Sequence, residues 1–382
     1  MRLYERYFAK QIYLTFAFVL FACSGLFFFF DLISELNSLR HGNYKFSYAI
    51  LRVMLQMPSR FYEIIPVVTL ISAIHVFAQI AASSEFTIFR VSGLSTHRAL
   101  GSILRIGVPI VVLTFVIGEV VTPYTHQLSE RVCSKMLSPS ASSQVRSSVW
   151  VKDTLSGNGK TAYITRFISV REIKPDATIA NILIYEFDSR FRLASVRTAN
   201  SGCYVRPGQW LLYNVTETRL HNISPASSTD KDVLNPVYRS EKVSMPKYQM
   251  HSSLTPKILS VLLITPDRMS ITNLLLYVKH LRDNHQNTQR YIIALWSKVF
   301  YPFAVLVMLV LSLPFAYLHT SARVVGIKVF AGIMLGISFQ LLNTIFAHIG
   351  MLNTWPALFT AAIPVLIYLA LGLLALHWIN HH

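Results

Sequence analysis

This chain has few charged residues for its length. Only 14% of its 382 residues are Asp, Glu, Lys or Arg, whereas 53% are hydrophobic, and the mean hydropathy is +0.44. About a quarter of the residues are charged in an ordinary soluble domain. The composition therefore argues against a soluble enzyme and favours a membrane protein.

Cysteine is also scarce. Cys23, Cys133 and Cys203 show no Cys-x-x-Cys spacing and have no histidine cluster near them in the sequence. Zinc and iron–sulfur sites need such spacings, so we expect no metal site and no cofactor bound by this chain. A disulfide between Cys133 and Cys203 stays open at this point, because both lie in the polar middle of the chain.

Signatures of catalysis and of nucleotide binding are missing as well. Residues 156–161 (Ser-Gly-Asn-Gly-Lys-Thr) come near to a phosphate-binding loop, but that motif needs a glycine where this chain has Thr154. It also needs a following helix, whereas 162–170 is rich in β-branched and aromatic residues. We expect a turn between strands here, no catalytic residues, and any ATP and Mg²⁺ in a partner subunit.

The chain does have six long apolar runs, at 11–30, 64–82, 99–121, 299–318, 329–347 and 356–376. Runs of roughly 20 residues match the hydrocarbon thickness of a bilayer. The first run is uncharged, long, and followed by no small-residue cleavage site, so we expect a span rather than a signal peptide. Three spans thus precede a polar middle stretch and three follow it.

Basic residues in the short loops indicate the orientation. With the N-terminus inside, eight face the cytoplasm: Arg2, Arg6, Lys10, Arg90, Arg98, Arg105, Arg323 and Lys328. Four face outward: Arg40, Lys45, Arg52 and Arg60. This excess predicts that both termini are cytoplasmic and that the middle domain is outside the cytoplasm.

The net charge of +17 suits nucleic acid, anionic lipid or another anionic ligand. Residues 123–268 carry 19 Lys and Arg against 11 Asp and Glu, so about half of the excess lies in the middle domain. Positive loops and a solvated basic surface account for part of this charge without any ligand. With six spans, we expect lipid rather than nucleic acid as the partner.

The middle of the chain is typical of a β domain. Strands are predicted at 162–170, 182–187, 190–196 and 209–215, with Asp188 and Ser189 forming a hairpin turn and a loop at 222–232. Successive strands without helices between them indicate an antiparallel sandwich, a jelly roll or an open barrel. A helix follows from Ser270 to about His285, either at the membrane interface or packed on the β domain.

These patterns predict three parts: a transmembrane half over 1–122, a β domain over 123–268, and a helix with a second transmembrane half over 269–382. Asp31, Glu63 and Glu119 lie near the outer ends of spans, and the last three spans contain no carboxylate. Ion-coupled transporters usually carry ionisable groups at the membrane midplane, so this class is disfavoured.

A short segment between the second and third spans has the features of an exposed helix. Ser83 or Ser84 can cap it, Glu85 suits its first turn and Gly93 its end. Phe86 and Phe89 share one face, which suits docking into a partner's groove. A helix lying on lipid fits the same pattern, and the two alternatives stay open here.

Gly332 and Gly336, in the fifth span, form a small-xxx-small pattern that lets helices approach closely. Such a pattern serves packing within one chain as well as contacts between subunits. The sequence does not choose between the two.

Several segments together resemble one known family. They are 84–95 (SEFTIFRVSGLS), 117–123 (IGEVVTP), 184–188 (IYEFD), Trp210 with its strand, 276–281 (LYVKHL) and 296–302 (WSKVFYP). In this order they resemble the lipopolysaccharide export permeases of the LptF/LptG family, and are most similar to its LptG branch, over essentially the whole chain.

The resemblance implies six membrane helices with a periplasmic β-jellyroll between the third and the fourth, in the inner membrane of a Gram-negative bacterium. It implies an LptF-like permease, two LptB-like ATPase subunits and an LptC-like single-span protein as partners, with lipopolysaccharide as the cargo. The segment at about 83–95 is then the coupling helix that enters the ATPase, through Glu85, Phe86, Phe89, Arg90 and Gly93.

The family places basic residues near the outer ends of the first and third spans, where they face lipid. Asp31 and Glu130 stand at positions where some members are basic. The expected lipid contacts are therefore nearby residues: Phe30, Arg40, Lys45, Arg60, Arg131 and Lys135. The alternative from another functional class is a membrane-anchored sensor or scaffold whose β domain binds a protein.

Overall fold

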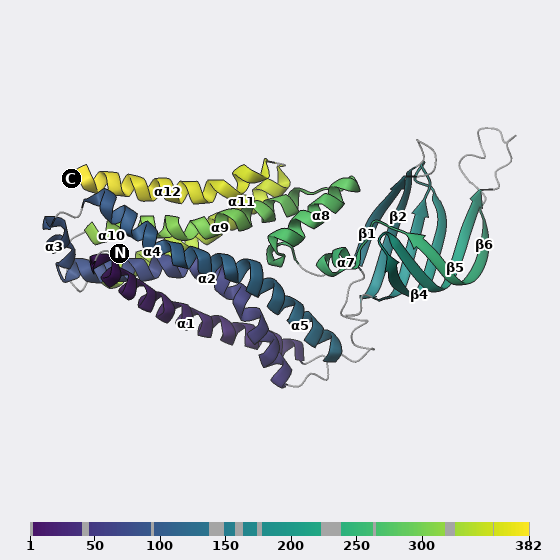
Figure 1. Ribbon diagram of the computed structural model, residues 1–382, viewed down its shortest axis with the longest axis horizontal. Helices are drawn as coiled ribbons and strands as arrows, with labels where there is room; N and C mark the ends of the chain where they lie inside the picture. The colour runs from purple at the N-terminus through teal and green to yellow at the C-terminus, as the bar shows by residue number, and fades with distance from the viewer. Residues whose placement is uncertain are drawn as a thin grey trace. The chain divides into compact units, whose positions relative to one another are not determined.

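The computed structural model describes residues 3–39, 46–92, 95–136, 149–156, 163–173, 178–222, 238–262, 265–317, 325–353 and 355–381. The chain divides into two compact units. We call the first the membrane unit, which comprises Met1–Cys133, Pro266–Leu275 and Thr288–His382. The sheet unit comprises Ser134–Thr265 and Leu276–Asn287. Figure 1 labels the elements of both.

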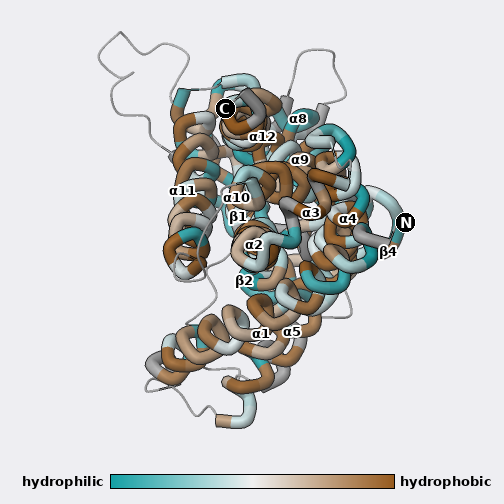
Figure 2. Tube along the Cα trace, turned by 90° about the vertical axis from the view of Figure 1, so that its left-hand side faces the viewer, coloured by the Kyte–Doolittle hydropathy of each residue, from teal (hydrophilic) through white to brown (hydrophobic). Residues whose placement is uncertain are grey.

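The membrane unit is built from long apolar helices. They are α1 (Leu3–Leu39), α2 (Phe46–Ala82), α4 (Thr96–Val116), α9 (Gln289–Ser312), α11 (Val325–Leu352) and α12 (Ala357–His381). A π-helical turn, η1 (Ile117–Val121), continues α4 into α5 (Thr122–Met136), and the short α10 (Pro314–Tyr317) follows α9. Among the described residues, six segments are long and apolar enough to cross a membrane, as the sequence predicts. Figure 2 shows hydrophobic residues along most of α11 and α12.

The helices α2 and α9 form the centre of this unit. In the most apolar part of each, 72% of the residues are buried, against 11% in α1 and 22% in α11. Leu70 and Ile74 of α2 pack with Ala304 and Met308 of α9. The outer helix α1 leaves aromatic side chains such as Phe21 largely exposed, as expected for a helix that meets lipid or another subunit.

The sheet unit contains six antiparallel strands that pair in sequence order. They are β1 (Val149–Ser156), β2 (Tyr163–Ile173), β3 (Ile179–Phe187), β4 (Leu193–Arg206), β5 (Gln209–Asn222) and β6 (Tyr238–His251). The described strands thus form one up-and-down sheet, curved in Figure 1, and no crossover of the Greek-key type joins them. The inserted antiparallel β domain is confirmed, although the sequence did not predict β1 and β6.

The predicted hairpin between β3 and β4 is present, but its turn is longer than two residues. Oδ1 of Asp188 accepts hydrogen bonds from the backbone nitrogens of Arg190 (2.9 Å) and Arg192 (2.8 Å). Phe191 adopts a left-handed backbone conformation with φ of 56°. This Asx-type turn delays the start of β4 to Leu193. Residues 157–162 lie outside the described residues, yet the strands β1 and β2 on either side pair as a hairpin, as expected for a turn.

The predicted helix after the sheet is α8 (Ile271–Asp283), preceded by α7 (Pro256–Leu262) and η3 (Pro266–Arg268). The Ser270 hydroxyl accepts a hydrogen bond from the backbone nitrogen of Asn273 at 3.2 Å, which caps the helix start. From Leu276 onward the helix belongs to the sheet unit, where Oδ1 of Asn284 accepts a bond from the nitrogen of Thr154 at 2.8 Å. This half packs with the sheet, the second of the two predicted alternatives.

Candidate functional site

Both chain ends lie at one end of the membrane unit, which we call the terminal end. There Phe8 of α1, Ile80 of α2, Ala99 of α4 and Leu376 of α12 share one buried cluster. The short helix α3 (Glu85–Val91) lies at the same end (Figure 1). The predicted coupling segment is therefore a helix, joined to α2 by a turn at Ser83 and Ser84.

That turn reverses the chain sharply. Ser84 adopts a left-handed backbone conformation with φ of 60°, which is uncommon outside glycine and asparagine. The nitrogen of Ile88 donates to the carbonyl of Ser84 at 3.3 Å, and the nitrogen of Ser92 donates to the carbonyl of Ile88 at 3.0 Å. The helix thus begins immediately after this residue.

The aromatic side chain of Phe89 packs against the rest of the chain. Its ring lies 5.3 Å from that of Phe8 at 77°, an edge-to-face arrangement, and it packs against the buried cluster of the terminal end. Among the described side chains of α3, those of Ile88 (64%) and Val91 (86%) are apolar and exposed. The side chains of Phe86 and Arg90, and all of Gly93, lie outside the described part of the structure.

Glu85 is tied to the first helix. The Tyr7 hydroxyl donates a hydrogen bond to its Oε2 at 3.0 Å. Glu5, two residues before Tyr7 on α1, is 2% exposed. Its carboxylate accepts a hydrogen bond from the Ser102 hydroxyl of α4 at 2.9 Å and lies 3.4 Å from the Arg105 guanidinium. The start of α1 therefore contacts both α3 and α4 through polar side chains.

At the opposite end of the bundle, Arg60 forms ion pairs. Its guanidinium donates two bonds of 2.9 Å to the Asp31 carboxylate of α1 and one of 3.2 Å to Glu63. Close by, Arg52 pairs with Glu35 at 2.6 Å. The Arg60–Asp31 and Arg52–Glu35 pairs join α1 to α2. The first shows why an acidic residue at position 31 fits a chain with arginine at position 60.

The other predicted lipid contacts are only partly described. Phe30 is 57% exposed on α1, next to Phe29. Arg40 and Lys45 lie outside the described residues. Arg131 and Lys135 belong to α5, but their side chains are also outside the described part.

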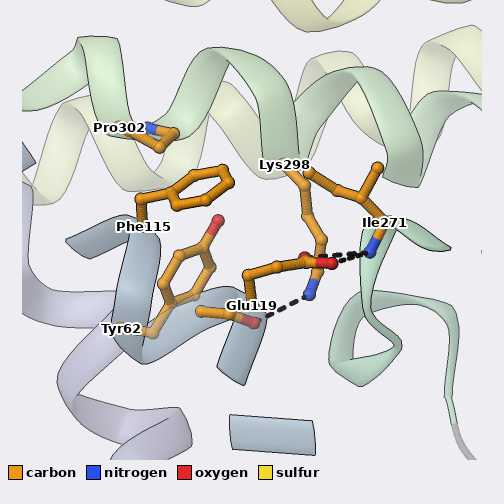
Figure 3. Close-up of a pocket in the computed structure, with 7 residues that line it drawn as sticks. Tyr62, Phe115, Glu119, Ile271, Lys298 and Pro302 are labelled. Atoms are coloured by element: carbon orange, nitrogen blue, oxygen red, sulfur yellow. Dashed lines mark hydrogen bonds between the residues drawn. The ribbon is translucent and has the colours of Figure 1, made fainter. Parts of the chain in front are cut away.

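A small pocket lies where the third and fourth spans meet the start of α8 (Figure 3). Lys298 of α9 is 6% exposed, and its Nζ donates to the carbonyl of Gly118 in η1 at 3.3 Å. Both carboxylate oxygens of Glu119 accept from the nitrogen of Ile271, at 2.8 and 2.9 Å. A π-helical turn leaves some backbone carbonyls without their usual hydrogen-bond donors. Here Lys298 donates to one of these carbonyls, that of Gly118.

Gly118 is needed for this packing. A Cβ atom at this position would collide with the ring of Tyr62, which itself packs against Tyr301. The predicted packing glycines behave similarly: a Cβ at Gly332 would lie 2.7 Å from Ile74, and one at Gly336 would lie 2.6 Å from Val67. Both contacts are with α2 of the same chain.

The sheet unit contains a buried network of charges. Glu186 of β3 contacts Arg166 of β2, and its Oε1 lies 2.5 Å from Nη1 of Arg197 on β4. Arg197 also donates to Glu217 of β5 at 2.8 Å, and Arg219 donates to the same carboxylate at 3.0 Å. Apolar residues continue the same buried face along these strands: Ile168, Ile182, Ile184, Ala199 and Val215.

The neighbouring arginines lower the pKa of both Glu186 and Glu217. Burial alone would raise the pKa of Glu186, but the charges of Arg166 and Arg197 and the bonds they donate outweigh it and lower that pKa. The pKa of Glu217 is lowered in the same way, against its burial, by Arg219 and Arg197. Both glutamates therefore stay ionised inside the fold, which a buried carboxylate does only when it is paired.

Neither unit presents the chemistry of a catalytic or metal site in its described residues. No group of three or more His, Cys, Asp or Glu residues gathers there in a way that could hold a metal ion. Cys203 is a free thiol whose sulfur lies 3.8 Å from the Tyr213 hydroxyl. The side chain of Cys133 lies outside the described part of the structure.

Comparison with known proteins assigns these features to a family. The model of the family "Lipopolysaccharide export system permease LptF/LptG" matches residues 6–378, which include both transmembrane halves and the sheet. The chain belongs to this family. Members of the LptF/LptG family are permeases, so no catalytic residue is expected in the chain itself.

Two relatives are named as permease proteins of the same export system. The chain is 27% identical over 361 residues to the lipopolysaccharide export system permease protein LptG of Escherichia coli (strain K12), covering 94% of each chain. It is 26% identical over 368 residues to LptG of Haemophilus influenzae, covering 96% of each. The similarity to the LptG branch is thus confirmed along nearly the full length.

Sequence reasoning missed three of the residues that shape these sites. Tyr7, Glu5 and Lys298 contact residues about 78, 97 and 180 positions away in the chain, respectively. A signal did exist for two of them. Glu5 lies shortly before the first apolar run, and Lys298 lies in the motif at 296–302, beside the fourth. A charged side chain in such a place usually has a polar partner.

Proposed function

We propose that this chain is a permease subunit of an ATP-driven exporter that extracts lipopolysaccharide from the inner membrane and passes it toward the outer membrane. The observation that carries the proposal is the family match over residues 6–378. It spans the membrane helices, the exposed α3 and the inserted sheet together, which a sensor or scaffold would not need in combination.

The physical problem is the cost of moving acyl chains. Each methylene transferred to water costs about 0.8 kcal/mol, so exposing a lipid with several chains costs on the order of tens of kcal/mol. An exporter must therefore offer an apolar path. In our proposal α1, α2 and α11, with their counterparts from an LptF-like permease, line a cavity to which Phe30 contributes.

Basic residues near the outer rim then meet the lipid phosphates through charge-assisted hydrogen bonds. The candidates are Arg40, Lys45, Arg60, Arg131 and Lys135. For Arg60, whose guanidinium is paired with Asp31 and Glu63, a phosphate has to compete with two carboxylates. We therefore expect Arg60 to contribute less to lipid affinity than the others.

The energy is supplied by a partner. We propose that two LptB-like ATPase subunits hydrolyse ATP in the cytoplasm, that α3 with Glu85, Phe86, Phe89, Arg90 and Gly93 is the coupling segment, and that Ile88 and Val91 provide its exposed apolar contact. An LptC-like single-span protein would receive the lipid with the sheet unit. Both termini are then cytoplasmic and the sheet unit is periplasmic.

Purification of the full chain from membranes tests this function. We expect an ATPase and a homologous six-span chain to co-purify with it, and the complex to transfer lipopolysaccharide from liposomes when ATP is added. A stable homodimer without an ATPase would instead support the sensor or scaffold and overturn the proposal.

Cysteine labelling tests the orientation. In a variant without the three native cysteines, Ser189→Cys should react with an impermeant maleimide in intact spheroplasts, whereas Ser92→Cys should react only after the membrane is opened. Both serines are exposed. The reverse pattern would place α3 outside the cytoplasm and rule out its proposed role in coupling.

A further inference from the structure

We propose that Tyr7 and Phe8 are positioning residues that connect α3 directly to the first membrane helix, so that a displacement of α3 moves α1. The proposal rests on the function proposed above, in which an ATPase acts on α3. It adds a route for that motion which differs from the chain connection between α2 and α3.

Two neighbouring residues of α1 each contact one residue of α3. The Tyr7 hydroxyl donates to the Glu85 carboxylate at 3.0 Å, and the Phe8 ring packs edge-to-face on Phe89 at 5.3 Å. The polar contact is directional and the aromatic contact excludes water, because Phe8 is only 4% exposed. Together they fix α3 at both its first turn and its middle.

The helix at the other side of this connection has a smaller share of buried residues in its apolar part than α2 has. In its most apolar part α1 is 11% buried, against 72% for α2. A displacement of α2 would disturb the central packing with α9, where Ile74 and Met308 are fully buried. A displacement of α1 breaks fewer buried contacts, so less free energy is needed to pass a motion into it.

The contact with α4 provides a fixed point beside this connection. Glu5 is buried, and its Oε1 accepts the Ser102 hydroxyl bond at 2.9 Å. Because Glu5 and Tyr7 are two residues apart, the first turns of α1 are held on α4 while Tyr7 and Phe8 contact α3. We infer that α1 tilts about this turn when α3 moves.

A double-mutant cycle on the full complex tests the connection. Tyr7→Phe removes only the hydroxyl, and Glu85→Gln weakens its acceptor. For Tyr7→Phe we expect the amount of co-purified ATPase and the rate of ATP hydrolysis to stay at the wild-type level. The lipopolysaccharide transferred per ATP should fall about two- to five-fold, the range for a partly exposed charged contact.

The combined variant distinguishes a shared contact from two separate effects. If Tyr7 acts through Glu85, Tyr7→Phe combined with Glu85→Gln should transfer as much lipid per ATP as Glu85→Gln alone. Phe8→Leu, which keeps an apolar side chain of similar volume, should lower the same ratio. Wild-type ratios in both Tyr7→Phe and Phe8→Leu, or effects that multiply in the combined variant, would overturn the inference.

Tyr13→Phe is the matched control. Its hydroxyl donates to the carbonyl of Ile106 at 2.8 Å and so joins α1 to α4 without touching α3. We expect its transfer ratio to equal that of the wild type; an equal loss in this variant would overturn the assignment to α3. A wild-type chain that binds no ATPase would refute the proposed function itself. A wild-type complex that transfers lipid normally, with Tyr7→Phe and Phe8→Leu both unaffected, would refute only this inference.

Discussion

In the membrane unit, several buried hydroxyl groups bond to carbonyls of their own helix, whereas in the sheet unit buried charges bond to charges on neighbouring strands. Thr69, Ser72 and Thr114 each donate to the carbonyl four residues earlier, at 2.7 Å. Lys298 also finds a backbone carbonyl, that of Gly118. The three hydroxyl bonds need no group from a neighbouring helix.

The sheet unit joins Arg166, Glu186, Arg197 and Glu217 across four strands. Because strands lie about 5 Å apart, side chains that are 20 residues apart in the chain stand next to each other. The difference teaches that a helix can satisfy buried hydroxyl groups within itself, where no water is available. A sheet can instead build a network that depends on its register.

The largest predicted effect comes from breaking that network. Glu186→Ala leaves the guanidinium groups of Arg166 and Arg197 buried without their shared carboxylate, which we expect to destabilise the sheet by about 3–5 kcal/mol. Hydrogen exchange of the full-length protein should show lost protection in the peptides of β2 to β4, with the peptides of α2 and α9 unchanged.

The matched control is Glu172→Ala, which removes a carboxylate from β2 of the same sheet outside the network. We expect it to change protection by less than about 1 kcal/mol. If Glu186→Ala were equally mild, the buried charges would contribute little, and the contrast between the two units would disappear.

A smaller effect is expected from helix packing in the membrane unit. In Gly336→Ala the new methyl group would lie 2.6 Å from Cγ1 of Val67, so α11 must shift from α2 at a cost of about 1–3 kcal/mol. Thermal unfolding in detergent measures this loss. Adding Val67→Ala should restore part of the stability; an unchanged melting temperature in both variants would contradict the packing argument.

The smallest effect concerns pH and acts on the sheet unit alone. Burial lowers the pKa of His280, and the charges of Asp153 and Asp283 offset this only in part. An imidazole whose pKa is lowered by folding stabilises the fold when neutral, so this contribution is lost as the pH falls below about 6.5. Glu186 and Glu217, whose pKa values are also lowered, lose their contribution only as the pH falls below about 4.3.

Hydrogen exchange corrected for intrinsic rates should therefore show two separate losses of protection in the sheet as the pH falls. The variant His280→Gln should remove the first loss and keep the second. One single transition near pH 4 in the wild type would show that His280 contributes nothing.

Much of this fold follows from hydrophobic patterning. The predicted spans agree with the observed helices, but α1 extends from Leu3 to Leu39, well beyond the apolar run at 11–30. Polar helix ends carry no hydropathy signal. The strand β6 was missed for a related reason: Arg239, Glu241 and Lys242 interrupt its alternation, and they lie on exposed positions.

The sites were harder to predict than the elements. The spacing of Phe86 and Phe89 predicts a shared face, but it does not say whether that face meets a partner or the rest of the chain. In the structure Phe89 meets Phe8, and Ile88 and Val91 are exposed instead. Likewise Arg60 has a basic side chain suited to phosphate, but its carboxylate partner Asp31 comes from another helix. Both outcomes depend on tertiary contacts that no local pattern encodes.

The contact between Glu119 and the start of α8 has a consequence for how such a chain can evolve. Glu119 lies before the inserted sheet and Ile271 lies after it, 152 positions along the chain. Their hydrogen bonds therefore hold the two ends of the insertion together. The cost of closing a loop grows only slowly with its length. The segment between Glu119 and Ile271 can therefore lengthen, shorten or be exchanged between relatives while the contact between these two residues is kept.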